Sequence, residues 1–123
     1  MSGSPSTRLT LGAGQRLKQT RDFARLKVQG RRLARGCVLM NWAELPLASS
    51  SRLGVVAAKR IGNAVVRSRA KRLLRQAFRL HRHDLRVPSE IVLVARDSIA
   101  DKAFVDVERD YLDALRVAGL LKT

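Results

Sequence analysis

The chain has 123 residues, of which 46% are hydrophobic and 28% charged, enough apolar material for one domain with a modest core and too much for a wholly disordered chain. Its formal net charge is +15, and residues 1–83 hold 19 lysines and arginines against two acids, Asp22 and Glu44. Such a concentration of positive charge predicts a polyanionic partner. Nucleic acid is favoured over a membrane because the basic part of the chain offers few aromatic anchors.

The sequence contains no signal for secretion or membrane insertion. Cys37 is the only cysteine, so no internal disulfide can form, and we expect it to be a small apolar residue in a strand. No apolar run approaches the roughly 18 residues of a membrane span, and the N-terminus "MSGSPSTR" lacks an apolar centre. We therefore expect a cytoplasmic protein with a disordered lead-in over residues 1–14 and one domain over 15–120.

The first predicted elements are a short helix and two strands. Thr20 is a suitable cap for a helix over residues 21–29 that stops at Gly30. Residues 32–45 are apolar and β-branched at their centre and predict a strand, and residues 52–60 predict a second one. Because a short loop joins these strands, an antiparallel hairpin is their simplest arrangement.

The most strongly patterned helix begins after Asn63, a residue type that caps helices, and runs to about Leu85, since Pro88 prevents continuation. Its side chains divide into two faces at about 100° per residue. The basic face holds Arg67, Lys71, Arg72, Arg75, Arg79 and Arg82. The apolar face holds Val66, Ala70, Leu73, Leu74, Ala77, Leu80 and His81. Arg69 lies on the boundary between them.

Two further elements complete the predicted fold. "EIVLVAR", residues 90–96, is typical of a strand buried on both sides, and the spacing of Phe104, Val107, Tyr111, Leu115 and Ala118 predicts a last helix. The order helix, strand, strand, helix, strand, helix predicts a single-domain α+β sandwich with a small mixed sheet.

The basic face differs from an ordinary solvated helix surface. Like charges at i, i+4 repel by a few tenths of a kcal/mol per pair, yet no acid lies between Ala64 and Arg82 to offset them. An external anion should therefore provide the compensation, and phosphate suits the arginine fork. A helix-turn-helix DNA reader would need a helix just before this one, whereas a strand precedes it, so the backbone of structured RNA is the better match.

These residues resemble a known family. "KRIGNAVVRSRAKRLLRQAFR", residues 59–79, is similar to the signature of the bacterial ribonuclease P protein subunit, and "RLKQTRDFARL", "RLGVVAAKR", "EIVLVAR" and "FVDVERDYLDAL" resemble its flanking segments in the same order. The resemblance implies a protein that binds the catalytic RNA of ribonuclease P and assists in removing the 5′ leader from precursor transfer RNA. It also implies a left-handed connection between parallel strands over 52–60 and 90–96.

The resemblance implies roles for individual residues. Contact with the catalytic RNA is expected for Lys59, Arg60, Asn63, Arg67, Ser68, Arg69, Lys71, Arg72, Arg75 and Arg79. Contact with the leader is expected for Phe23, Lys27, Asn41, Val56 and Ala58. No catalytic residue and no metal ligand are expected on this chain, because the family's Mg²⁺ ions are held by RNA. We expect a protein monomer in a 1:1 complex with that RNA, and no membrane partner.

Several positions depart from the family pattern. Ser68 stands where members usually carry Asn, Lys27 where an aromatic is common, and Asn41 near a common tyrosine, while serines often occupy the positions of Val56 and Ala58. We therefore expect leader recognition that is weaker or differently tuned. Trp42 could supply a ring, although strand alternation points it away from the face of Asn41.

Two other function classes fit the composition. A protein-only nuclease would need carboxylates or a His–carboxylate pair, and "HRHD", residues 81–84, is the candidate. His81 and Asp84 are i, i+3, but His81 belongs to the apolar face and is expected to be a packing residue. A ribosomal or other structural RNA-binding protein is the second alternative, because basic α/β domains of this size bind RNA in a similar way.

Overall fold

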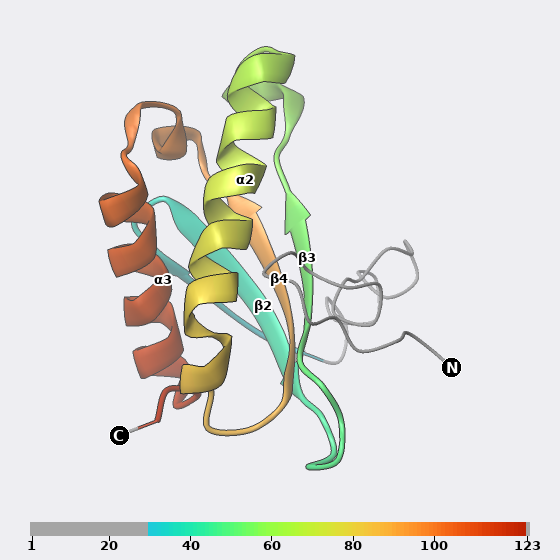
Figure 1. The fold of residues 1–123 in the computed structure, drawn as a ribbon. Coiled ribbons are helices and arrows are strands. Elements are labelled where there is room, and N and C mark those ends of the chain that lie inside the picture. Colours follow the sequence, from blue (N-terminus) through green and yellow to red (C-terminus); the bar gives the residue numbers. More distant parts are fainter. Residues whose placement is uncertain (1–29, 123) are drawn as a thin grey trace.

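The structure, a computed structural model, describes residues 30–122. Figure 1 shows two layers, a four-stranded sheet with the helices α2 (Ala64–His81) and α3 (Phe104–Ala118) on one of its faces. This confirms the predicted α+β class with a small mixed sheet. The helix predicted over residues 21–29, its cap Thr20 and the boundary after residue 14 lie outside the described residues.

The segment predicted as a single strand over residues 32–45 is a hairpin, so that prediction is wrong. It consists of β1 (Arg31–Arg35) and β2 (Val38–Glu44), which pair antiparallel. The chain reverses at Gly36, whose φ of +54° lies in the left-handed region that favours glycine. A glycine inside an apparent strand was the available signal for this turn.

Partners distant in sequence hold the turn. The backbone N–H of Cys37 donates to the buried carboxylate of Asp110 on α3 at 3.0 Å, and its carbonyl accepts from Arg96 N–H at 2.9 Å. A Cβ at position 36 would overlap the Asp110 carboxylate. Burial, with the nearby Asp110 carboxylate, raises the pKa of the Cys37 thiol to about 12, so the thiol stays protonated. Cys37 is thus a buried apolar residue as expected, but in the turn before β2.

The antiparallel pairing predicted between the segments 32–45 and 52–60 is also wrong, because another strand lies between them in the sheet. The sheet order is β1-β2-β4-β3, where β3 is Arg52–Val56 and β4 is Ser89–Ala95. β4 pairs antiparallel with β2 and parallel with β3. Its residues are buried except for a half-buried Val94, and a strand apolar on both sides is stable only in the interior of a sheet.

The connection from β3 through α2 to β4 is left-handed. In Figure 1 both strands point upward, β4 lies to the left of β3, and α2 passes in front of the sheet. About 98% of such connections are right-handed, so this hand is a rare feature, and it agrees with the family resemblance. α2 contacts β3 and β4 while α3 contacts β1 and β2, so among residues 30–122 no further helix or strand lies beside α2 on the β3 flank.

The core lies between the two helices and the sheet. From α3, Val107, Tyr111 and Leu115 are fully buried, as their spacing predicted. From α2, the predicted residues Ala70, Leu73, Leu74 and Ala77 are buried. Two details differ from the predicted apolar face. Phe78 is buried although it was not included, and Leu80 is 55% exposed, because the packed face of α2 is rotated toward Phe78.

α2 is shorter than predicted. It ends at His81, and the tighter turn η3 (Arg82–Asp84) follows it where helix was expected up to about Leu85. The His81 ring bonds to the Asp84 carboxylate three residues later at 2.8 Å, a spacing that suits the 3₁₀ turn. None of the described helices has both the length and the apolar composition needed to cross a membrane.

Candidate nucleic-acid interface

The interface begins in the connection between β3 and α2. This connection is the 3₁₀ turn η2 (Lys59–Ile61), which replaces the end of the strand predicted over residues 52–60. Ile61 is buried and fixes the turn to the core, which leaves Lys59 and Arg60 exposed. Asn63 caps α2 as predicted, because its Oδ1 accepts the backbone N–H of Val66 at 3.0 Å.

A basic face runs along α2 from its first turn to its last. It comprises Arg67, Lys71, Arg72, Arg75 and Arg79, whereas Arg82, the sixth residue predicted for it, lies in η3 after the helix ends. These residues are half-buried except for Arg72, which is exposed, and long basic side chains can cover apolar surface with their stems. The Arg67 guanidinium donates to the Gly62 carbonyl oxygen at 3.4 Å. For Lys71, Arg72 and Arg79, the described part of the chain supplies no ion-pair partner.

The charge of this face adds to that of the helix end. The first turn of α2 contains no acid, and its free N–H groups carry the positive end of the helix dipole next to Lys59 and Arg60. A chain of phosphates could therefore follow the basic face and meet more positive charge at the helix start. Ser68 is exposed in the first turns of α2, between Arg67 and Arg69, where its hydroxyl can donate or accept.

Two of the predicted RNA-binding residues also make contacts within the protein. Arg69 donates to the carbonyl oxygen of Lys102 at 2.6 Å, which ties α2 to the segment before α3. The Arg60 side chain donates to Asp97 at 3.0 Å, and both side chains are largely exposed. Replacing Arg69 should therefore change stability as well as RNA affinity, whereas the exposed pair of Arg60 contributes little to stability.

The predicted leader-binding residues fall partly outside the described chain. Phe23 and Lys27 are in residues 1–29 and are not described. Asn41 on β2 is in register with a residue of β4, and Val56 on β3 is in register with the residue two further along β4, so both lie on the same face of the sheet. That face is opposite the helices, and Ala58 is the second residue after the end of β3.

Trp42 lies on the other face, as strand alternation predicted. Its side chain is 5% exposed and belongs to the core beneath the helices, so it cannot supply an aromatic ring beside Asn41. No charged side chain was predicted on the sheet face that carries Asn41, but the structure shows an ion pair there. Arg52 lies 3.5 Å from the buried carboxylate of Glu90, and the two residues are directly opposite on β3 and β4.

β1 carries three arginines whose position in the fold could not be predicted from the sequence. Arg31, Arg32 and Arg35 are all exposed on this edge strand. An exposed edge can pair with other strands, and a row of charged residues on it discourages such pairing. Their positive charge is at the opposite edge of the sheet from β3, so it does not extend the basic face of α2.

His81 is a link between helices and not a packing residue, so that expectation is wrong. Its Nδ1 lies 2.8 Å from an Asp84 oxygen, and its Nε2 lies 2.7 Å from an oxygen of Glu108 on α3. Burial alone would lower the pKa of His81, but the hydrogen bonds and charges of Glu108 and Asp84 outweigh it, so the pKa is raised above 6.5. The sequence did not indicate this polar role, because His81 shares the predicted apolar face of the helix.

This link should make stability depend on pH. Because the folded-state pKa of His81 is raised, its contribution is complete below about pH 6.5 and is lost as the pH rises through the folded-state value. We expect the difference in free energy of unfolding between the wild type and His81→Gln to shrink between about pH 5.5 and about pH 8.5 in urea titrations. A difference that stays constant with pH would show that protonation of His81 has no part in the link.

The same geometry argues against the nuclease alternative. Both ring nitrogens of His81 already have a carboxylate partner, so neither is available to activate water. Asp84 and Glu108 bind opposite sides of the ring and do not converge on one point. Within residues 30–122, no group of three or more His, Cys, Asp or Glu side chains is placed to hold a metal ion.

Comparison with known proteins gives a consistent result. The family model described as Ribonuclease P matches residues 11–119. A protein of Syntrophomonas wolfei named "Ribonuclease P protein component" is 33% identical over 105 residues, covering 85% of this chain and 87% of its own. A protein of the same name from Symbiobacterium thermophilum is 34% identical over 107 residues, covering 87% of this chain and 93% of its own.

Solved structures agree with the sequence comparison. The RNase P protein of Staphylococcus aureus superposes with a TM-score of 0.79 at 25% identity, covering 88% of this chain and 98% of that one. The RNase P protein of Thermotoga maritima superposes with a TM-score of 0.74 at 26% identity, covering 82% of this chain and 94% of that one. The similarity thus extends over nearly the full length of each relative.

Proposed function

The chain belongs to the ribonuclease P protein family, and from this premise we propose how its residues serve the ribonuclease P holoenzyme. As a protein component of ribonuclease P, it takes part in the processing of transfer RNA together with the ribonuclease P RNA. We propose that the basic face, with Lys59, Arg60, Asn63, Ser68 and Arg69 at its start, binds the phosphate backbone of that RNA.

The observation that supports this most is the lack of acid along the basic face. Over the 18 residues of α2 every ionisable side chain is basic, although like charges at this spacing repel one another. Phosphate binding removes the repulsion and releases the counterions condensed on the RNA. Within residues 30–122 no further element lies beside α2 on the β3 flank, which is compatible with approach of an RNA helix along the basic face. The basic face would recognise the backbone and shape of the RNA and not its base sequence, because the grooves of RNA offer few base edges to side chains.

The chemistry of cleavage is proposed to belong to the RNA. The described residues hold no set of side chains suited to a metal ion, so we assign no catalytic step to this chain. Mg²⁺ ions bound by the RNA would activate the attacking water when present. The role of this chain is electrostatic, because its cations reduce the repulsion between the phosphates of the catalytic RNA and those of precursor transfer RNA.

The sheet face opposite the helices is the proposed contact for the 5′ leader. Asn41 and Val56 lie on this face, with Ala58 at its border, and Phe23 and Lys27 belong to the same predicted set. Stacking on an aromatic ring holds single strands without regard to sequence. Since Trp42 lies on the other side of the sheet, Phe23 is the ring proposed for this task.

The stoichiometry and the compartment follow from the same role. We propose one protein per RNA, because a single basic face on a small domain provides one continuous binding surface. Precursor transfer RNA is made in the cytoplasm of a bacterium, and a single buried cysteine is compatible with a reducing compartment. The proposed place of action is therefore the cytoplasm.

Direct binding distinguishes this proposal from a role on the ribosome. We expect the full chain to bind a bacterial ribonuclease P RNA at least about tenfold more tightly than fragments of ribosomal RNA of equal length at the same salt concentration. Filter binding or electrophoretic mobility measures both affinities side by side. Equal affinity for all RNAs, or a preference for a ribosomal fragment, would support the structural RNA-binding alternative instead.

A further inference from the structure

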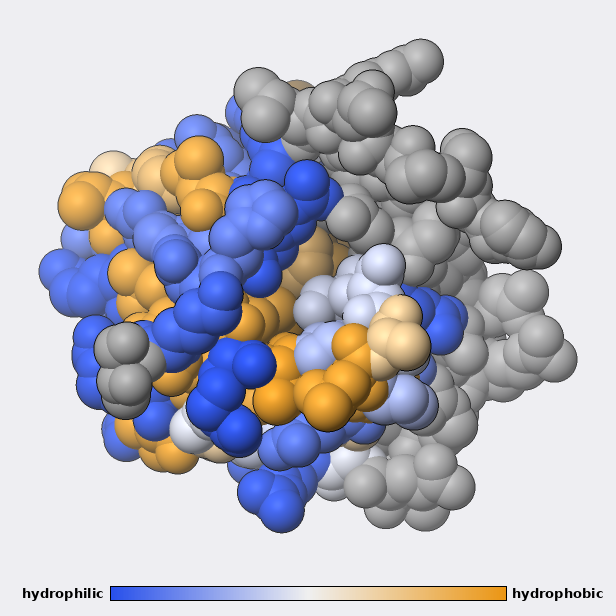
Figure 2. All heavy atoms as spheres, turned by 60° about the horizontal axis from the view of Figure 1, so that its bottom comes forward, coloured by the Kyte–Doolittle hydropathy of each residue, from blue (hydrophilic) through white to orange (hydrophobic). Residues whose placement is uncertain are grey.

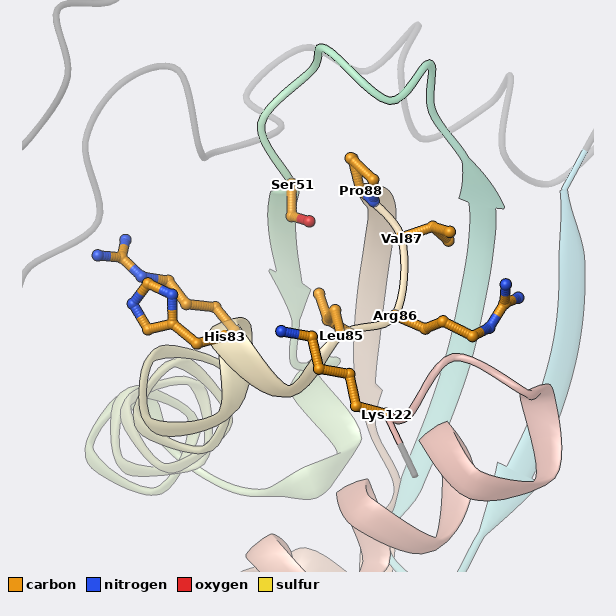
Figure 3. Close-up of a pocket in the computed structure, with 8 residues that line it drawn as sticks. Ser51, His83, Leu85, Arg86, Val87, Pro88 and Lys122 are labelled. Atoms are coloured by element: carbon orange, nitrogen blue, oxygen red, sulfur yellow. The ribbon is translucent and has the colours of Figure 1, made fainter.

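A second basic site lies just beyond the C-terminal end of α2, where the basic face ends. It is a pocket of about 290 Å³, and its lining comprises Ser51, Arg82, His83, Leu85, Arg86, Val87, Pro88 and Lys122. We call it the terminal pocket. Figure 3 shows Ser51, His83 and Lys122 around it, each from a different segment, with Leu85 between them. Figure 2 brings this end of the molecule forward, and hydrophilic side chains there lie beside apolar ones.

The last residues of the chain are fixed in a way that places Lys122. Its backbone N–H donates to the carbonyl oxygen of Asp84 at 2.8 Å, and Leu121 forms a bridge with Leu85. The N–H of Arg86 donates to the carbonyl oxygen of Leu120 at 2.6 Å. These bonds tie the end of the chain to the segment that leads into β4. The ammonium group of Lys122 is therefore brought to the pocket by a held backbone and not by a free tail.

Ser51 contributes a directed donor. Its Oγ accepts the backbone N–H of Ser89 at 3.0 Å. Because that bond uses an acceptor site of the hydroxyl, the Ser51 proton remains to be donated to another group. In Figure 3 the hydroxyl points into the space between Pro88, Leu85 and Lys122. His83 adds an N–H donor in either of its protonation states.

The lining contains no acidic side chain. Two carboxylates of the described residues beside the lining are engaged elsewhere, since Asp84 bonds to the His81 ring at 2.8 Å and Glu44 lies 3.8 Å from the Arg86 guanidinium. That guanidinium also donates to the Gly119 carbonyl oxygen at 2.9 Å, and in Figure 3 it points away from Lys122. The cations left to the pocket are Arg82 and Lys122, with His83 as a further donor.

From this arrangement we infer that the terminal pocket binds a phosphate group, with Lys122, Arg82, His83 and Ser51 as its ligands. Two cations and two further hydrogen-bond donors around a concave space suit a tetrahedral anion, and the apolar floor limits competition from water. The phosphate could belong to an RNA backbone or be a free ion. The phosphate arm of the test uses inorganic phosphate and no RNA, so its outcome does not depend on the proposed function.

The test uses the full chain, Lys122→Gln, and Arg116→Gln as a control that removes one exposed arginine paired with Asp113. Inorganic phosphate is titrated against chloride at equal ionic strength, and the amide resonances of Ser51, His83 and Lys122 are followed by NMR. We expect saturable shifts in the wild type and the control, and at least about a fivefold weaker affinity in Lys122→Gln. His83→Gln provides a second variant should Lys122→Gln fold poorly.

The RNA arm identifies the source of the phosphate. If it is an RNA backbone, Lys122→Gln lowers the salt dependence of ribonuclease P RNA binding by about one unit of slope, and Arg116→Gln leaves it unchanged. Weaker phosphate binding without any change toward RNA identifies the ligand as the free ion, which still supports the site. Wild-type resonances that do not saturate, or shifts that persist equally in Lys122→Gln and His83→Gln, overturn the inference.

Discussion

Replacing Lys71 and Arg79 together with glutamine should lower the affinity for ribonuclease P RNA by at least about tenfold at physiological salt. These two side chains belong to the basic face, and the described residues give neither of them an ion-pair partner. If each neutralises one phosphate, the slope of log K against log salt should fall by about 1.8. Filter binding over a series of salt concentrations measures both quantities.

A matched control separates position from charge. Arg109→Gln/Arg116→Gln removes the same two charges from α3, where Arg109 lies 3.3 Å from Asp106 and Arg116 lies 2.7 Å from Asp113. Both arginines are mostly exposed, so these two pairs contribute at most about 1 kcal/mol each, and Arg109 Nε also lies 3.8 Å from the Asp110 carboxylate. We expect RNA affinity to change by less than about twofold. Equal losses in the two double variants would mean that RNA responds to net charge alone and that the basic face has no special role.

Gly36→Ala should be the most destabilising single substitution of a surface residue, at about 3 kcal/mol. Alanine in the left-handed region costs about 1–2 kcal/mol. In addition, its Cβ would displace the Asp110 carboxylate, which leaves the Cys37 N–H without its partner, at about 1–3 kcal/mol. In thermal unfolding, the midpoint should fall by more than about 10 °C.

Gly119→Ala provides the control for backbone strain. Gly119 ends α3 with a φ of +76°, but a Cβ there would have no atom within 4 Å. We expect a loss of only about 1 kcal/mol from this substitution. The difference between the two variants isolates the contact between Gly36 and Asp110. Similar losses in both would show that the close approach to Asp110 has no energetic consequence.

Periodicity and capping were sufficient to predict the elements whose signals are local. The two faces of α2, its cap Asn63 and the buried stripe of α3 all depend on residues three or four apart, and the structure has them. β4 was likewise identifiable, because a continuous apolar run requires cover on both sides. The family signature added the parallel pairing and the left-handed connection, which no local pattern encodes.

Strand partners and the β1–β2 turn were beyond sequence reasoning for a physical reason. The turn at Gly36 is held by Asp110 and Arg96, which are far along the chain, so the neighbours of Gly36 do not reveal it. The pairing of β2 with β3 looked favourable only because β4, the better central strand, comes later in the sequence.

The candidate site shows the same division. The basic face could be predicted because it lies on one helix, where spacing determines direction. The hydrogen bond between His81 and Glu108 could not be predicted, and neither could the terminal pocket. Each of them forms only where two or more elements meet in the fold. Lys122 gave no signal in the sequence, since its place depends on its N–H donating to the Asp84 carbonyl oxygen and on the Arg86 N–H donating to the Leu120 carbonyl oxygen.

The central claim is that this chain acts with a catalytic RNA and has no nuclease centre of its own. The most direct measurement is cleavage of a precursor transfer RNA at low Mg²⁺ by a bacterial ribonuclease P RNA, with and without the full chain, and by the chain alone. The account predicts leader removal that is strongly stimulated only when RNA and protein are both present. Cleavage by the protein alone, or no stimulation of the RNA at any protein concentration, would contradict it.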